Sequence, residues 1–215
     1  MLDELAAGAF IERLGIPGAP SVALDAGITR TPPLPFPYPV AVKLLSAEIA
    51  HKSDIGGVVL GVADGAALLA AIATIRANVA ERMPEARVAR VLVQPMVSGL
   101  GEVLLGYRVD RDVGPLVMVA AGGVLTEIER DRSLRLAPVD LAAAHEMIAE
   151  VRGLIALTGY RGKSNGDLDA LAHAIVALSR LADDASVAEA EINPLMVRSA
   201  GEGVVAVDAV ARLMM

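Results

Sequence analysis

Two apolar segments near the end of the chain carry oxygen-bearing side chains at spacings that could bind a metal ion. Residues 187–197 and 203–209 are predicted to pair as a hairpin whose turn centres on Ala200-Gly201, because glycine tolerates the positive φ of a tight turn. In this register Asn193 lies directly opposite Asp208. Opposed residues of a hairpin share one face of the sheet, so the amide and the acid are expected side by side.

Glu191 adds a second carboxylate, because residues two apart on a strand point to the same face. Unpaired carboxylates on an apolar sheet are costly, so this group of oxygens needs a cation. An oxygen-only donor set in a chain without cysteine favours Mg²⁺, which commonly takes one or two protein oxygens together with phosphates. The alternative is a solvent-exposed edge hairpin, and a slip of one residue would separate the groups onto opposite faces.

The segment HKSDIGGV (51–58) lies between two predicted strands and has the features of an anion-binding loop. Gly56 and Gly57 allow backbone N–H groups to approach a phosphate closely, and Lys52 and Ser53 could add donors. The pattern is not a Walker sequence, and two glycines before a strand are often only a turn.

Lys43 interrupts an apolar strand, where a cation is rarely tolerated without an anion partner. A phosphate is one candidate partner, and a structural carboxylate is the alternative. His51 stands beside the predicted phosphate loop, where its imidazole could act as a nucleophile toward a phosphoryl group. The other two histidines, His145 and His173, lie in predicted helices and are expected to be structural or solvent-facing.

Residues 92–97 leave a strand through a proline and could offer main-chain N–H and C=O groups to an adenine edge. Glu102, eight residues after Gln94, could bind ribose hydroxyls. The spacing alone does not distinguish this arrangement from an ordinary connection between strands.

The composition limits the classes of protein to which the chain can belong. Hydrophobic residues make up 54% of the 215 positions but aromatic residues only 2%, which favours layers of aliphatic strands and helices. The formal charge of −7 argues against general affinity for nucleic acid. The longest apolar stretches fall far short of the roughly 20 residues that span a bilayer, and the acidic start lacks the basic region of a signal peptide. We therefore expect a soluble cytoplasmic protein.

Strands and helices alternate irregularly along the chain. Helices are predicted at 3–14, 65–80, 141–152 and 168–182, with the last three capped by Asp64, Asp140 and Asp167. Strands are predicted at 40–45, 57–62, 88–97, 102–110, 115–121, 133–139, 187–197 and 203–209. A turn around Ser98-Gly99 is expected to join 88–97 to 102–110. The proline-rich run 31–39 is expected to be extended. This order favours an α+β or mixed α/β fold with antiparallel pairs over a doubly wound sheet.

In this order, the motifs resemble the ATP-grasp domain of ADP-forming acyl-CoA synthetases, the acetate-CoA ligase (ADP-forming) family related to succinyl-CoA synthetase β subunits. The resemblance covers residues 38–212, with a weaker match at ERLGIP (12–17). The matching stretches are YPVAVKLLSAEIAHKSDIGGV (38–58), VLVQPMVSGLGEVLLGYRVDRDVGP (91–115), AAGGVLTEIERDRSLRLAP (120–138), GYRG (159–162), EINPL (191–195) and AVDA (206–209).

The resemblance implies the ATP-grasp fold, with two lobes and a nucleotide cleft between them. We expect an N-terminal helix, first strand and proline-rich linker over 1–37, one lobe over 38–95 and a second over 96–215. Such relatives carry an amphipathic helix where residues 25–37 are short and proline-rich, and their GLGG reads AAGG (120–123) here.

The resemblance also implies a role for individual residues. His51 is similar to the second histidine of a phosphate relay, which takes a phosphoryl group from a partner's histidine and passes it reversibly to ADP. For ATP or ADP the implied ligands are the phosphate-contacting Lys43, the loop residues Lys52, Ser53, Gly56 and Gly57, the adenine hinge at Gln94, Met96 and Val97, and the ribose-binding Glu102. Asn193 and Asp208 match the two Mg²⁺ ligands.

By resemblance the chain is the nucleotide-binding subunit of an NDP-forming acyl-CoA synthetase that works with a separate CoA-binding subunit of the alpha type. Two alternatives remain at this stage. One is a non-catalytic ATP-sensing or regulatory subunit of an acyl-CoA or acyltransferase complex. The other is a structural subunit that binds no nucleotide.

Overall fold

The computed structural model describes residues 1–49, 52–123, 131–162 and 164–214. The chain forms two compact units, a smaller one of residues 3–5 and 19–97, and a larger one of residues 1–2, 6–18 and those from Ser98 onward. The division at Val97/Ser98 lies two residues beyond the expected boundary. The first 37 residues do not stand apart as a segment of their own, because each unit takes a share of them.

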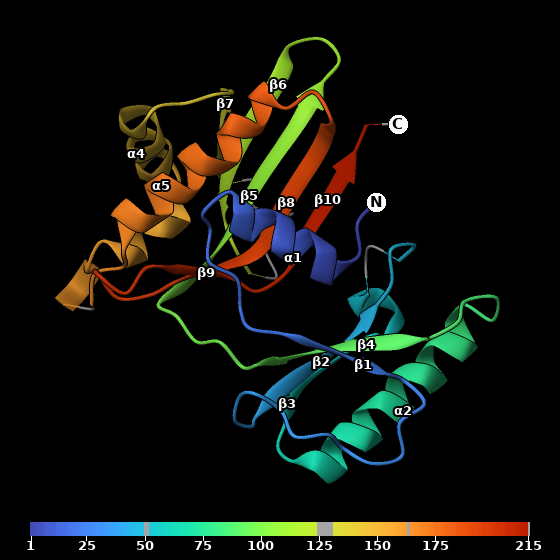
Figure 1. Ribbon diagram of the computed structural model, residues 1–215. Helices are drawn as coiled ribbons and strands as arrows, with labels where there is room; N and C mark the ends of the chain where they lie inside the picture. Colours follow the sequence, from blue (N-terminus) through green and yellow to red (C-terminus); the bar gives the residue numbers. More distant parts are fainter. Residues whose placement is uncertain (50–51, 124–130, 163, 215) are drawn as a thin grey trace. The chain divides into compact units, whose positions relative to one another are not determined.

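The smaller unit is a four-stranded antiparallel sheet with one long helix, α2 (Gly65–Arg82). Its strands run in the order β1-β4-β2-β3 and are β1 (Val22–Asp25), β2 (Val40–Leu45), β3 (Val58–Val62) and β4 (Arg90–Pro95). A short 3-10 turn, Ser53–Ile55, precedes β3. The helix follows the length of the sheet in Figure 1.

The sequence of α2 explains how it packs. Asp64 caps the helix by accepting a hydrogen bond from the Ala67 amide (2.8 Å). Its buried side chains recur every three or four residues and form one face: Leu68, Ala71, Ile72, Ile75 and Val79. They share a core with alternate residues of the two central strands: Val40, Val42, Leu44, Val91 and Val93.

Alternation places the intervening residues of β2 and β4 on the opposite face of the small sheet. Lys43 pairs with Leu92 across these strands, and Ala41 pairs with Gln94. Lys43 is 4% exposed and Gln94 is 5% exposed, so two polar side chains are buried on this face.

The larger unit is built on a sheet in the order β10-β8-β5-β6-β7, with β9 also paired to β8. Its strands are β5 (Gly101–Asp110), β6 (Gly114–Ala121), β7 (Arg132–Leu136), β8 (Val187–Val197), β9 (Val204–Ala206) and β10 (Ala209–Leu213). Its helices are α1 (Glu4–Arg13), whose first two residues belong to the smaller unit, α4 (Leu141–Glu150) and α5 (Leu168–Ser179). Three 3-10 turns lie at Arg152–Leu157, Tyr160–Gly162 and Arg180–Asp183.

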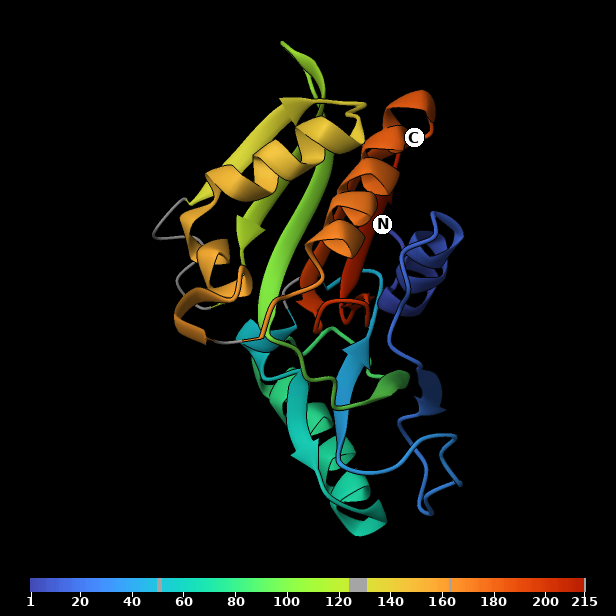
Figure 2. The same ribbon diagram turned by 90° about the vertical axis from the view of Figure 1, so that its left-hand side faces the viewer.

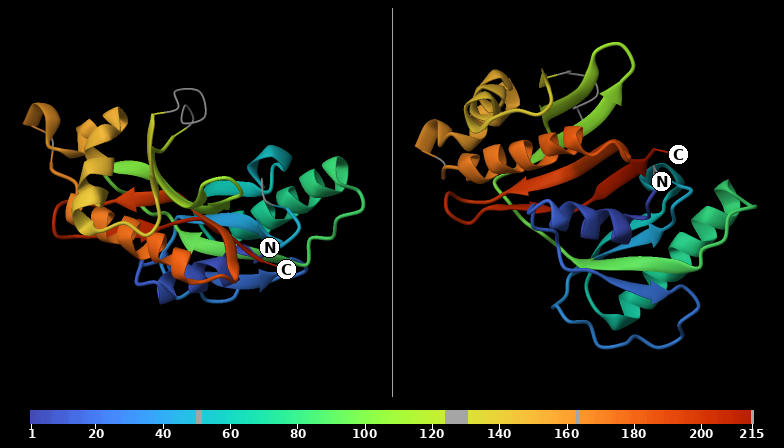
Figure 3. Two further views of the ribbon diagram at one scale, coloured as in Figure 1. Left: turned by 90° about the horizontal axis from the view of Figure 1, so that it is seen from above. Right: turned by 45° about the horizontal axis from the view of Figure 1, so that its top comes forward.

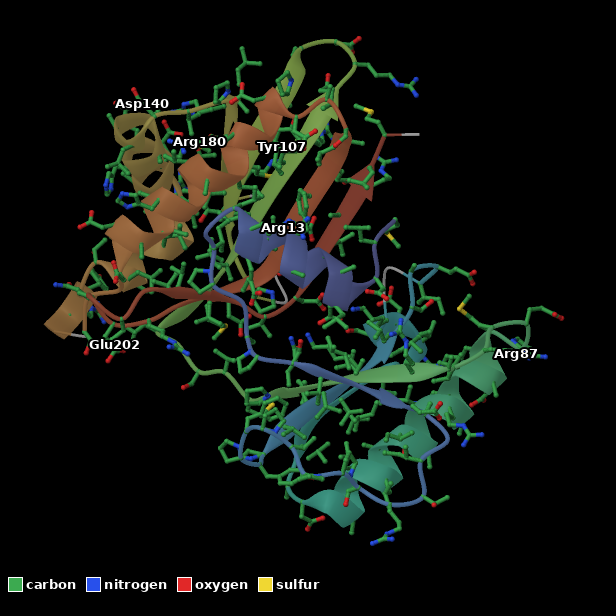
Figure 4. All side chains as sticks on the ribbon, viewed as in Figure 1. Arg13, Arg87, Tyr107, Asp140, Arg180 and Glu202 are labelled. Atoms are coloured by element: carbon green, nitrogen blue, oxygen red, sulfur yellow. The ribbon has the colours of Figure 1, made fainter. Side chains whose placement is uncertain are left out.

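The described helices of the larger unit cover one face of its sheet, as Figures 1 and 2 show for α4 and α5. Val103, Leu105 and Tyr107 alternate along β5 and point into this core. The Tyr107 hydroxyl donates to the Leu181 carbonyl (3.1 Å), and Figure 4 labels this tyrosine on β5 beside α5. Figure 3 gives two further views of the same layers.

Most of the predicted elements are confirmed, and two differ. Residues 88–97 and 102–110 were expected to be joined by a turn, but β4 and β5 belong to different sheets, so this expectation was wrong. The expected strand 203–209 divides into β9 and β10, which extends to Leu213. No helix or strand forms over 26–39, in agreement with its five prolines. None of the described helices is long and apolar enough to cross a membrane.

Candidate functional site

The terminal hairpin has the register that the sequence predicted. Leu195 pairs with Ala206 on one side of Asn193, and Ile192 pairs with Ala209 on its other side. The two pairs belong to one continuous register. The backbone N–H of Asn193 donates to the backbone carbonyl of Asp208 (3.0 Å). Asn193 therefore lies opposite Asp208, as expected.

The side chains around this pair divide cleanly between the two faces of the sheet. Ile192 is fully buried in the helix-covered core, so its neighbours Glu191 and Asn193 lie on the opposite face. On the other edge of β8, Val103 pairs with Leu195, which leaves a bulge at Asn193. The bulge interrupts regular pairing and leaves Asn193 exposed.

The residues on this face fit a magnesium ion by their chemistry. Asn193, Asp208 and Glu191 offer only oxygen acceptors toward a cation, and Mg²⁺ prefers oxygen ligands. In the described ranges, no group of three or more His, Cys, Asp or Glu lies together. Asn193 and Asp208 as protein ligands of Mg²⁺, with phosphates alongside, stay a prediction.

The same face of the larger sheet is hollowed beside Glu191. The hollow measures about 260 Å³ and is lined by residues of β5, β6, β7 and β8, among them Gly106, Met118 and Leu134. Its lining also includes charged side chains, among them Arg108 and Glu189. A ligand with both a flat apolar part and a charged part suits such a surface.

One carboxylate, Asp167, holds the turn that sets this register. Its Oδ1 caps α5 by accepting from the Ala170 amide (3.0 Å), as the sequence predicted. Its Oδ2 accepts from the amides of Gly201 and Gly203, each at 2.9 Å, and these glycines form the turn between β8 and β9. Sequence reasoning identified the cap and missed the turn, because the two partners lie more than 30 residues away.

These contacts stabilise the ionised form of the carboxyl. Hydrogen bonds from the Ala170 and Gly203 amides, followed by those from Gly201 and the charge of His173, hold the pKa of Asp167 below its usual range. Because the folded pKa lies below the unfolded value of about 3.9, the stabilisation is complete above that value. It is lost as the pH falls through the folded pKa.

Asp167→Asn should lower stability by about 1–2 kcal/mol at pH 7, because one amide oxygen cannot both cap α5 and accept from the turn. The difference from the parent protein should shrink as the pH falls below about 4 and through the lowered pKa of the folded parent carboxyl. Urea denaturation at pH 7 and pH 3 measures both effects.

Asp140→Asn is the matched control, because Asp140 (labelled in Figure 4) caps α4 through a single oxygen to the Ala143 amide. An asparagine keeps that bond, so the loss should stay within about 1 kcal/mol, the size of a helix-terminus charge effect. Equal losses in the two variants would show that the turn contacts contribute nothing.

In the smaller unit, Glu4 holds the two lysines that were predicted to contact phosphate. Lys43 donates to Oε1 of Glu4 at 2.6 Å, and Lys52 contacts Oε2 of the same carboxylate. All three side chains are buried, with exposures of 6% for Glu4, 4% for Lys43 and 7% for Lys52. The structure thus provides the carboxylate that was the alternative partner for Lys43. Sequence reasoning required an anion there but did not find Glu4.

The two glycines of the 51–58 segment shape the loop that carries Lys52. Gly56 has a φ of 67°, in the left-handed region that favours glycine. Its amide donates to the Ser53 carbonyl (3.0 Å), and the Gly57 amide donates to the Lys52 carbonyl (2.8 Å). Both amides therefore bond within the loop, and a role for them as phosphate donors stays a prediction. Ser53 is exposed at the loop surface.

Gly57→Ala should destabilise the protein by about 1–3 kcal/mol, because the added Cβ would lie 2.9 Å from the Lys52 carbonyl oxygen and 3.3 Å from Cβ of Leu44. Gly8→Ala is the control, since its added Cβ meets nothing within 4 Å. Gly8 lies inside α1, so alanine there should be neutral or stabilising. Thermal unfolding compares the two, and equal melting temperatures would contradict the close approach at Gly57.

The predicted adenine hinge lies at the end of β4. Oε1 of Gln94 is buried and has no hydrogen-bond partner in the described part of the chain. The Met96 amide is already used, because it donates to the Pro39 carbonyl (3.1 Å). The Met96 side chain is 43% exposed, and Val97 is partly buried. The hinge therefore offers a buried acceptor with no hydrogen-bond partner among the described residues and an exposed apolar side chain, while the Met96 amide is already occupied.

Glu102 occupies the start of β5, with an exposed side chain. The Gly122 amide donates to the Glu102 carbonyl (2.7 Å), and a Cβ at position 122 would lie 2.7 Å from that carbonyl oxygen. Gly122 thus allows the end of β6 to lie directly against the backbone of Glu102. Glycine is required here by close approach.

The candidate residues fall into one group in each unit. The smaller unit contains Lys43, Lys52, Ser53, Gly56, Gly57, Gln94, Met96 and Val97. The larger unit contains Glu102, Asn193 and Asp208. His51, the expected phosphate carrier, lies outside the described residues.

Comparison with known proteins gives a consistent result. A family profile described as an ATP-grasp domain matches residues 1–213. The chain is 40% identical over 197 residues to acetate–CoA ligase [ADP-forming] I of Archaeoglobus fulgidus. This match covers 91% of this chain and 29% of that protein. It is 35% identical over 174 residues to the beta subunit of acetate–CoA ligase [ADP-forming] II of Pyrococcus furiosus, covering 80% and 74%.

Solved structures give the same relationship. The chain matches a dinucleotide-forming acetyl-coenzyme A synthetase 1 of Ca. Korarchaeum cryptofilum, in complex with coenzyme A and Ca-AMPCP, with a TM-score of 0.88 and 31% identity. The match covers 99% of this chain and 93% of that one. Another structure of that synthetase contains Mg-AMPPCP and has its phosphohistidine segment pointing towards the nucleotide binding site (TM-score 0.79, 30% identity, 98% and 92% covered).

The extent of the match differs between relatives. The chain spans 29% of the length of the A. fulgidus ligase, and 74% of the P. furiosus beta subunit. It therefore corresponds to one portion of the longer proteins.

Proposed function

This chain belongs to the ATP-grasp domain family, and we propose that it is the nucleotide-binding portion of an NDP-forming acyl-CoA synthetase. In this proposal it uses Mg-ATP or Mg-ADP and a phosphohistidine relay to couple the interconversion of acyl-CoA and carboxylate to ATP. In this proposal the enzyme is a cytoplasmic ligase that forms acid–thiol bonds.

The observation that carries the proposal is the pairing of Asn193 with Asp208 on a sheet face that also has a hollow. These oxygens suit a metal ion that bridges phosphates. Bound Mg²⁺ would neutralise phosphate charge and orient the phosphoryl group. Because the chain is acidic overall, ATP must be bound by a metal ion and a few placed cations. Lys43 and Lys52 are the cations that the smaller unit supplies.

The nucleoside end of ATP has candidate contacts as well. The buried acceptor of Gln94 suits the exocyclic amine of adenine, and the exposed Met96 offers apolar contact to a base. The carboxylate of Glu102, exposed at the start of β5, could accept hydrogen bonds from ribose hydroxyls.

His51 would carry the phosphoryl group between two other molecules. Its imidazole nitrogen attacks the phosphorus of a phosphohistidine on the partner, and the partner's N–P bond breaks as the new one forms. A terminal phosphate oxygen of ADP then attacks the same phosphorus, which releases His51 and produces ATP. Run in reverse, ATP phosphorylates His51 and ADP leaves.

The proposal needs a partner that binds CoA and carries the first histidine. The P. furiosus relative is named as a beta subunit, and the A. fulgidus relative is a longer single chain. We propose a CoA-binding subunit or segment of the alpha type as the partner in a hetero-oligomer. The choice of acyl group would lie with that partner.

Asp208→Asn should remove most of the effect of Mg²⁺ on nucleotide binding, because it takes one negative charge from the metal ligands. For the parent protein, Mg-ADP at a hundredfold excess over Kd should stabilise the fold by about 2.7 kcal/mol. Adding Mg²⁺ should lower the Kd of ADP in both proteins, but the factor by which it falls should be about ten times smaller in the variant. Calorimetric titration with and without Mg²⁺ measures the difference.

Glu202→Gln is the control for charge, since Glu202 (labelled in Figure 4) lies exposed in the turn between β8 and β9. Its Mg²⁺ response should equal that of the parent. A parent protein that binds no Mg-nucleotide would contradict the proposed function, and an unchanged response in Asp208→Asn would remove Asp208 from the metal site.

Incubation with γ-labelled Mg-ATP should leave label on the parent chain as an acid-labile phosphohistidine, and His51→Ala should carry none. His145→Ala is the control, because His145 contacts Asp169 on the surface of the larger unit and should label normally. Labelling of His51→Ala at the parental level, or none of the parent, would contradict the relay.

A further inference from the structure

Glu4 joins two lysines that are far apart in the sequence. Its two carboxylate oxygens are divided between them, with Oε1 on Lys43 and Oε2 on Lys52. The chain contains 3 lysines and 16 arginines, so two of its three lysines meet on this one carboxylate. Lysine is rare in this chain, so two lysines on one carboxylate are not explained by a high lysine content.

The contact resembles the way in which two lysines bind one phosphate. A carboxylate and a phosphate both present two oxygens held a little over 2 Å apart on one central atom, and a lysine ammonium binds either as a point charge. The three side chains are all more than nine-tenths buried. Buried charges persist when they are paired, so the lysines require an anion in this position whether or not a nucleotide is present.

We propose that Glu4 is an internal counter-anion that occupies the place of a nucleotide phosphate and is exchanged for it on binding. The inference rests on the proposed function for the identity of the ligand, a phosphate of a nucleoside di- or triphosphate. Glu4 is then a positioning residue, which keeps Lys43 and Lys52 together while the site has no phosphate.

The charges explain why Glu4 must leave its lysines. Glu4 cancels one unit of the positive charge of the two lysines, so its departure raises by one the charge that they offer to a phosphate. A phosphate beside a retained carboxylate would be repelled in a buried environment, where such interactions are screened little. Glu4 is the first residue of α1, so its released carboxylate stays near a helix N-terminus, which favours negative charge.

If Glu4 is exchanged for a phosphate, removing its charge should tighten phosphate binding. Loss of a purely structural contact would not tighten it. Glu4→Gln keeps the shape of the side chain, replaces one of the two accepting oxygens by a donating NH2 group, and removes the competing charge. It should bind ADP and inorganic pyrophosphate about tenfold more tightly than the parent, which corresponds to about 1.4 kcal/mol. Titration calorimetry without Mg²⁺ isolates the lysine contacts from the metal site.

Two further variants test whether the effect acts through the lysines. Asp3→Asn is the matched control, since the neighbouring Asp3 forms an ion pair with the exposed Arg90 (3.2 Å), and its affinity should change less than twofold. In a Lys43→Met background, Glu4→Gln should gain less than it does alone, because one of the two cations that the carboxylate neutralises is absent.

The stability of the variant provides a second measurement. Without ligand, Glu4→Gln should melt at a lower temperature than the parent, because the two buried lysines lose the negative charge of Glu4. With pyrophosphate its melting temperature should rise by more than that of the parent. If Glu4→Gln does not fold, Glu4→Asp, whose shorter side chain holds the carboxylate farther from both lysines, should show a larger rise than the parent.

The outcomes separate this inference from the proposed function. Equal or weaker binding of pyrophosphate and ADP by Glu4→Gln, in a parent that binds Mg-ADP, would overturn the exchange and leave the proposed function intact. A parent that binds pyrophosphate but no nucleotide, with tighter binding in Glu4→Gln, would support the exchange and refute the proposed function.

Discussion

The register of the terminal hairpin is the constraint on which the candidate metal site depends. Asn193 and Asp208 lie opposite each other because one register continues from the β8–β9 pairs to the β8–β10 pairs. A shift by one residue would move every side chain of the hairpin to the other face of the sheet. Asp167 prevents such a shift by accepting hydrogen bonds from both glycines of the turn, while it also caps α5. A helix cap thus fixes the geometry of a site on the opposite face of the sheet.

In the proposed function, the candidate nucleotide contacts of the two units differ in chemistry. The larger unit contributes neutral and acidic oxygens, which suit a metal ion, and an exposed carboxylate at Glu102. The smaller unit contributes the cations Lys43 and Lys52 and the buried acceptor of Gln94. Lys43 and Gln94 lie on the face of the small sheet opposite α2, so these polar residues do not disturb the apolar core. The same alternation of strand residues therefore supports both packing and binding.

Local patterns predicted the elements well and their partners less well. The caps at Asp64, Asp140 and Asp167 were correct, because a cap is decided within four residues of sequence. The turn expected between 88–97 and 102–110 was wrong, because adjacent strands can pair in different sheets and nothing local decides which. The hairpin register was predictable, since a short turn and a few paired residues determine it.

The sequence by itself determined the helices, the strands, the opposition of Asn193 to Asp208, and the need for an anion beside Lys43. It could do so because side-chain periodicity, caps and the cost of a buried charge act over a few residues. Only the tertiary structure decided that this anion is Glu4, 39 residues away, and that Lys52 shares it. Ionic contacts between distant segments depend on how the chain folds back on itself, and that path is set by the packing of whole sheets and helices.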